Sequence, residues 1–176
     1  SDLHLYGLLS NGGVHSHNTH LYALLELCKK QDFDKVYVHC FLDGRDTPLT
    51  SGVEYMRDLE NKCKELEVGK VASICGRYYV MDRDKRWDRI ELAYNALTTG
   101  EGKHFRSAER AIENSYECQE SDEFIKPVVI VDEEDKPIGL VESGDAVIFA
   151  NFRPDRAREI SHAFKDTNFN GFTRKT

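Results

Sequence analysis

The sequence lacks any apolar run of the roughly 20 residues that a transmembrane helix needs, and it opens with no signal-peptide pattern. We therefore expect a cytoplasmic protein with no membrane partner. Basic residues are also scarce, because 24 lysines and arginines stand against 31 acidic residues and give a net charge of −7. A general nucleic-acid binder needs the opposite balance, so we expect no nucleic-acid partner.

Cysteines are few and form no C-x-x-C pair. The count is odd, the spacing is wide, and four of the five lie inside apolar helix or strand patterns, as buried free thiols do. This usage indicates a reduced cytosolic chain rather than a disulfide framework. The five are Cys28, Cys40, Cys63, Cys75 and Cys118.

Familiar catalytic motifs are missing as well. There is no G-x-S-x-G nucleophile elbow, no P-loop and no dinucleotide-binding fingerprint after a strand. Ser10 and Ser16 lie in a Gly-rich loop, but neither can be assigned a general base with an orienting third group. The sequence therefore predicts no catalytic nucleophile.

The chain does contain a repeated strand–loop–helix pattern. At 176 residues it is about one domain long. Alternating strands and helices predict an α/β fold, a three-layer α/β/α sandwich with a largely parallel sheet, plus a β-hairpin in the C-terminal half. The expected strands are 3–10, 35–42, 71–75 and 146–150, with hairpin arms at 128–131 and 138–141.

The helices carry apolar stripes at helical spacing and recognisable start signals. Ser51 with Glu54 predicts a capping box for the second helix, and Ser107 predicts the cap of a short later helix. Pro154 fits the first turn of the last helix, where its missing N–H costs nothing.

Unusual polar residues gather in the loops that follow the strands. Because the carboxyl ends of parallel strands meet at one edge of a sheet, these loops should converge there. Several guanidinium groups at one edge repel each other unless an anion lies among them, and arginine suits phosphate and carboxylate groups. We therefore predict a site for a small phosphorylated anion, built from Asn11, His15, His17, Asp43, Arg45, Asp46, Arg77, Arg83, Arg153 and Arg156.

Each member also has a simpler interpretation. Arg77 and Arg83 could form structural ion pairs with Asp82 or Asp84, and Arg86 and Arg89 fit a solvated helix face. The histidines of His15-x-His17-x-x-His20 could bind a metal, contact an anion through His15, or make structural hydrogen bonds. Of the others, His39 is predicted to be a satisfied core histidine, whereas His4, His104 and His162 show no constellation.

Four long motifs in collinear order resemble those of the cofactor-independent (2,3-bisphosphoglycerate-independent) phosphoglycerate mutases. They are LLSNGGVHSH at 8–17, FLDGRDTP at 41–48, GRYYVMDRDKRW at 76–87 and ANFRPDR at 150–156. In that family a phosphotransferase, or substrate-binding, domain is inserted into a phosphatase-like domain. The resemblance implies that residues 1–165 form this domain and that 166–176 are a linker stub toward the phosphatase-like partner domain.

The resemblance also implies the site. The phosphoglycerate contacts would be His15, Arg45, Asp46, Arg77, Arg83, Arg153 and Arg156, with no catalytic residue and no metal ligand in this chain. A serine and two Mn²⁺ or Mg²⁺ ions in the partner domain would carry the phosphate between 3-phosphoglycerate and 2-phosphoglycerate, with no 2,3-bisphosphoglycerate requirement. The chain alone would then be inactive. Two alternatives stay open, a stand-alone phosphate-binding or regulatory module and a hydrolase with a metal at the histidine cluster.

Overall fold

The computed structural model describes residues 1–10, 18–81, 84–150, 154–167 and 169–175, with no description of the side chains of 154–157. Within this part of the chain one six-stranded sheet has the order β4-β5-β3-β2-β1-β6. Strands β1 (Leu3–Leu9), β2 (Val36–Leu42), β3 (Lys70–Gly76) and β6 (Ala146–Phe149) are parallel neighbours. The predicted α/β class and largely parallel sheet are therefore confirmed.

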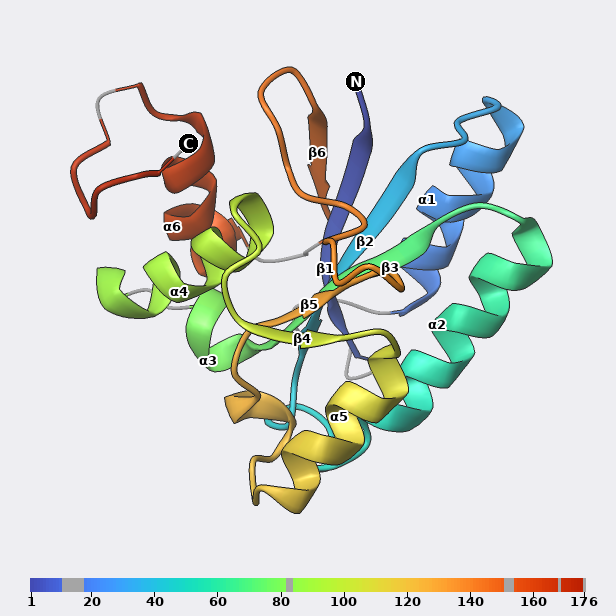
Figure 1. Ribbon diagram of the computed structural model, residues 1–176, viewed down its shortest axis with the longest axis horizontal. Helices are drawn as coiled ribbons and strands as arrows, with labels where there is room; N and C mark the ends of the chain where they lie inside the picture. The colour runs from blue at the N-terminus through green and yellow to red at the C-terminus, as the bar shows by residue number, and fades with distance from the viewer. Residues whose placement is uncertain (11–17, 82–83, 151–153, 168, 176) are drawn as a thin grey trace.

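Helices cover both faces of the sheet (Figure 1). On one side pack α1 (Asn18–Lys30), α2 (Gly52–Leu66) and α5 (Ala108–Glu117). On the other lie α3 (Arg77–Val80), α4 (Trp87–Thr98) and α6 (Pro154–Lys165). Strand β1 is buried along its whole length because both of its faces are covered, which explains its almost unbroken apolar sequence.

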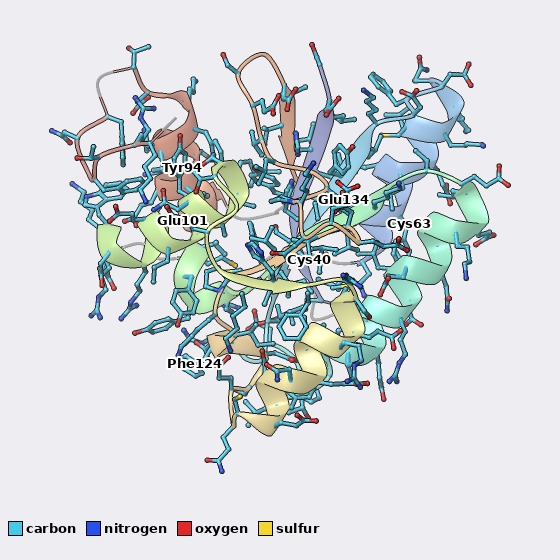
Figure 2. The ribbon with its side chains drawn as sticks, viewed as in Figure 1. Cys40, Cys63, Tyr94, Glu101, Phe124 and Glu134 are labelled. Carbon is cyan, nitrogen blue, oxygen red and sulfur yellow. The ribbon has the colours of Figure 1, made fainter. Side chains whose placement is uncertain are left out.

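The thiols lie where the apolar patterns predict. Cys28, Cys40, Cys63 and Cys75 are buried and free, and only Cys118 is exposed. Figure 2 labels Cys40 on β2 and Cys63 on α2, which belong to the same apolar layer between sheet and helices. Burial alone raises the pKa of the Cys75 thiol, so it acts as a small apolar side chain.

The predicted hairpin is only partly formed. Strand β5 (Val128–Ile130) is antiparallel to β3, and a turn through 132–136 follows it, closed by the Asp132 N–H on the Lys136 carbonyl. Instead of a second full strand at 138–141, a single bridge joins Val131 to Pro137. The other neighbour of β5 is β4 (Lys103–Phe105), a short parallel strand that the sequence pattern did not reveal.

The two predicted helix caps have different outcomes. The Ser107 hydroxyl accepts the Arg110 N–H at the start of α5, as expected. The capping box at Ser51 is wrong, because the Ser51 hydroxyl donates to the Pro48 carbonyl and makes no cap hydrogen bond.

The described part of the tail packs back onto the domain. The rings of Phe169 and Phe172 pack edge to face. Phe169 also packs against Trp87 of α4, and Phe172 packs against Tyr94 of the same helix. The assignment of 166–176 as a linker stays a prediction. No helix in the described ranges is long and apolar enough to cross a bilayer.

Candidate functional site

The carboxyl ends of β1, β2 and β3 hold a connected group of polar side chains, three of which are buried. Ser10 follows β1, Asp43 follows β2 and Arg77 follows β3. The Ser10 hydroxyl donates to Asp43 Oδ2 at 2.8 Å, and Arg77 Nη1 donates to Asp43 Oδ1 at 2.8 Å. Arg77 Nη1 also donates to Asp46 Oδ2 at 3.1 Å. We refer to Ser10, Asp43, Asp46 and Arg77 as the carboxyl-end row.

Asp43 is the centre of this row. Its Oδ1 accepts the backbone N–H groups of Arg45 and Asp46 in addition to the Arg77 guanidinium. Burial acts to raise the pKa of this carboxyl, but hydrogen bonds from Asp46, Arg77, Ser10 and Arg45 outweigh it and hold the pKa below its usual value. Asp43 therefore stays ionised and fixes the start of the loop that carries Arg45 and Asp46.

Arg77 is bound by carboxylates of this row. Only 4% of its side chain is exposed, and it forms ion pairs with Asp43 and Asp46. The predicted alternative partner Asp82 lies outside the described residues. Both ion pairs are made by Nη1. A buried guanidinium fixed by two carboxylates in this way has its orientation set in advance.

Arg45 differs from Arg77 in its exposure. Its side chain is 56% exposed, and its Nε lies 3.8 Å from Glu123 Oε1, a long surface ion pair. Of the seven predicted contacts, the structure therefore brings together Arg45, Asp46 and Arg77. His15, Arg83 and Arg153 lie outside the described residues, as do Asn11 and His17, and the Arg156 side chain is not described.

The described flanks of the remaining loops meet beside this edge. Helix α6 begins at Pro154, as predicted, and follows β6. The buried Glu159 of α6 accepts the Lys85 N–H at 2.6 Å, which joins α6 to the segment before α4. In the helix that follows, Arg89 lies 3.7 Å above the Tyr78 ring, so it contacts α3 rather than a purely solvated face.

A second row of polar side chains crosses the same strands and was not predicted in full. Asp145 Oδ2 lies 2.9 Å from His4 Nε2, His4 Nδ1 lies 2.8 Å from His39 Nε2, and His39 Nδ1 lies 2.7 Å from the Ser73 hydroxyl. We call these four residues the histidine row. His39 is a satisfied core histidine as predicted, but the view that His4 has no constellation is wrong.

The hydrogen bonds of the histidine row are satisfied with a neutral His39. In one such arrangement His4 donates to Asp145, His39 donates to His4 and Ser73 donates to His39. Burial, together with the neighbouring His4, lowers the pKa of His39 well below its usual value, which favours the neutral form of this ring. The row is therefore a structural element of the core.

Metal ligation finds no support among the described residues. No group of three His, Cys, Asp or Glu side chains in that part of the chain could hold an ion. The exposed His20 lies in the first turn of α1, as its spacing predicts, while His15 and His17 lie outside the described residues. The described carboxylates of the site are Asp43 and Asp46, which both bind Arg77.

Comparison with known proteins agrees with this architecture. The whole chain, residues 1–176, matches the family model described as the BPG-independent PGAM N-terminus. It is 56% identical over 175 residues to the 2,3-bisphosphoglycerate-independent phosphoglycerate mutase of Acetivibrio thermocellus, and 58% identical to that of Clostridium perfringens strain SM101. Each match covers 99% of this chain and 34% of the relative, so the chain spans about a third of their length.

A solved structure has the same fold. The structure titled "Crystal structures of Leishmania mexicana phosphoglycerate mutase at low cobalt concentration" superposes with a TM-score of 0.94 at 39% identity. The match covers 98% of this chain and 33% of that one.

Proposed function

Because the chain belongs to the family of 2,3-bisphosphoglycerate-independent phosphoglycerate mutases, we propose that it binds the glycerate phosphate substrate of its parent enzyme. The contacts proposed are Arg45, Asp46 and Arg77, joined by His15, Arg83, Arg153 and Arg156. The observation that carries the proposal is the buried Arg77, fixed by Asp43 and Asp46 at the edge of the sheet where Arg45 also lies.

The chemistry of phosphoglycerate suits these groups. It carries a phosphate and a carboxylate, both of which match the donor fork of arginine, and a hydroxyl that can donate to a carboxylate such as Asp46. In the proposed reaction the glycerate stays bound here while the phosphate moves between its two hydroxyls. Side chains fixed in advance hold it at a lower entropic cost than flexible ones.

The rest of the reaction is proposed for the parent protein outside this chain. A serine nucleophile and two Mn²⁺ or Mg²⁺ ions would belong to the phosphatase-like domain, where the metals would activate the serine. Residues 1–165 would form the substrate-binding domain, with 166–176 leading toward that partner. We therefore expect this chain alone to bind substrate without turning it over.

Titration with 3-phosphoglycerate, followed by ¹H–¹⁵N chemical shifts, tests the proposal. We expect shifts at the amides of Arg45 and Asp46 in the wild type, and an affinity about tenfold lower in Arg45→Ala. The matched control is Arg57→Ala, because Arg57 is a similarly exposed arginine on α2 that pairs with Glu109. Inorganic phosphate serves as the second ligand.

The outcomes separate the alternatives. Preference for 3-phosphoglycerate over inorganic phosphate supports the mutase substrate site, whereas equal affinities favour a general phosphate-binding module. Equal affinities of Arg45→Ala and the wild type contradict the assignment of Arg45. Turnover of 3-phosphoglycerate by the chain alone contradicts the proposed division of labour.

A further inference from the structure

The 121–125 segment connects two parts of the candidate site. It contains the short helix η1 (Asp122–Phe124). At one end the Asp122 N–H donates to the Leu49 carbonyl at 2.9 Å, in the loop after β2. At the other, the Gly76 N–H donates to the Ile125 carbonyl at 2.8 Å, at the end of β3. The segment therefore bridges the loop that carries Arg45 and the strand that directly precedes Arg77.

The Asp122 side chain adds a second connection. This residue is 1% exposed, and its Oδ2 accepts the N–H of Gly52, the first residue of α2, at 2.7 Å. Its Oδ1 accepts the Tyr116 hydroxyl of α5. Asp122 therefore accepts a backbone N–H at the start of α2, where the Ser51 side chain accepts none. It does so although it lies 70 residues from Gly52 in sequence.

The backbone packing at this place leaves no room for a side chain on two glycines. A Cβ on Gly44, whose φ is +65°, would lie 2.8 Å from the Glu123 nitrogen, and one on Gly76 would overlap the Glu123 carbonyl. Each of these glycines directly precedes a site arginine, Arg45 and Arg77. The segment therefore fixes the backbone from which both arginines extend.

Side chains of the segment extend this contact. Glu123 Oε1 lies 3.8 Å from Arg45 Nε, and the Phe124 ring packs on Tyr78 of α3 with centroids 5.1 Å apart. Figure 2 labels Phe124 on η1, which contacts α3. Tyr78 directly follows Arg77, so the segment contacts the neighbours of both arginines.

We propose that Asp122 is a positioning residue for substrate binding, which holds the loop of Arg45 and Asp46 in register with Arg77 through its hydrogen bonds to Gly52 and Tyr116. The inference rests on the proposed binding of glycerate phosphate. Asp122 itself contacts no substrate in this scheme. Both of its carboxyl oxygens accept hydrogen bonds, and burial raises its pKa to about 6.

The test compares Asp122→Ala with Asp122→Asn. Alanine removes the acceptor, whereas asparagine keeps an oxygen for Gly52 and an amide that can donate to Tyr116. The matched control is Asp132→Ala, since Asp132 Oδ1 also accepts backbone N–H groups but follows the antiparallel β5, at the opposite edge of the sheet. Affinity for 3-phosphoglycerate and hydrogen exchange at the Arg45 and Asp46 amides are measured below the melting temperature of every variant.

We expect Asp122→Ala to weaken binding by about tenfold or more and to speed exchange at both amides, because small misplacements of binding groups have large effects. Asp122→Asn should stay within about threefold of the wild type, and so should Asp132→Ala. A folded Asp122→Ala with wild-type affinity and exchange overturns the proposal, as does equal loss in Asp122→Asn. Should the wild type not bind 3-phosphoglycerate, the proposed function fails, and the exchange rates alone then decide whether Asp122 positions the loop.

Discussion

The carboxyl-end row lies at the ends of β1, β2 and β3, and the histidine row crosses the same three strands, but the two rows differ in the charge at their buried centres. The carboxyl-end row contains ionised groups, with a carboxylate and a guanidinium as its buried centre. The histidine row has a neutral imidazole, His39, at its buried centre, and His4 and the Ser73 hydroxyl contact its two ring nitrogens. Two polar rows in one sheet can therefore have different roles, and charge at the strand ends marks the one suited to an anion.

The largest effect is expected from removing the cation of the carboxyl-end row. Arg77→Ala leaves the buried Asp43 without its charged partner, which should lower the free energy of unfolding by about 3–5 kcal/mol. Urea denaturation of both proteins measures this difference in the free energy of unfolding. Adding Asp43→Asn to Arg77→Ala should recover part of the loss because the orphaned charge is then gone. A loss under about 1 kcal/mol would show that water, not Arg77, compensates Asp43.

The histidine row should respond to pH instead. The pKa of His39 is lowered in the folded state, so the neutral ring is favoured there while the unfolded chain binds a proton below pH 6.5. Stability from this group is therefore present above pH 6.5 and lost as the pH falls. Between pH 7 and pH 5 the free energy of unfolding falls by about 2 kcal/mol at most. The reason is that uptake of one proton by the unfolded chain changes this free energy by roughly 1.4 kcal/mol per pH unit.

Asp122 acts in the opposite direction over part of this range, since its raised pKa of about 6 favours the folded state as the pH falls from 6 toward 4. The measurement is therefore the difference in unfolding free energy between the wild type and His39→Asn, in which the Asp122 contribution cancels. A difference that does not change with pH contradicts the neutral assignment of His39.

Ser73→Ala probes the end of the histidine row and should have a smaller effect on stability than Arg77→Ala. It leaves His39 Nδ1 buried without its donor, at a cost of about 1–3 kcal/mol in unfolding free energy. The affinity for 3-phosphoglycerate should not change, because Ser73 lies within β3, away from the strand ends. Altered affinity with unchanged stability would break the distinction between the two rows.

Arg45→Ala should have the smallest effect on stability, within about 0.5 kcal/mol, because its ion pair is long and exposed. It should nevertheless weaken the binding of 3-phosphoglycerate, because a guanidinium donor is lost from the proposed site. Thermal unfolding beside the titration shows whether affinity and stability separate at this residue. A large drop in melting temperature would place Arg45 with the structural residues.

The sequence predicted what depends on local patterns. The periodicity and the apolar content of the sequence located β1, β2, β3 and the longer helices α1, α2, α4, α5 and α6, but not the short helices α3 and η1. Ser107 was a correct cap because a cap needs only its own helix. The convergence of parallel strand ends is a general rule of such sheets, so it correctly predicted that Arg45, Asp46 and Arg77 lie at one edge.

Long-range pairs could not be read in the same way. The ion pair of Arg77 with Asp43 spans 34 residues, and the contact of His4 with Asp145 spans 141. Local reasoning offered Asp82 or Asp84 for Arg77 and no partner for His4. At the start of α2 the Ser51 hydroxyl donates to the Pro48 carbonyl instead of capping the helix, and the distant Asp122 accepts the Gly52 N–H. Partners supplied by distant segments leave no periodic signal.

The position of β1 inside the sheet has a consequence for how the domain is made. This first strand has β2 on one side and β6 on the other, and Leu3 pairs with Ala146. During synthesis β1 leaves the ribosome before the other described strands of this sheet, yet one of its hydrogen-bonding edges has no partner until about 140 further residues have followed. Truncation before β6 exposes this apolar edge, so such products should aggregate, and the domain should complete its fold late.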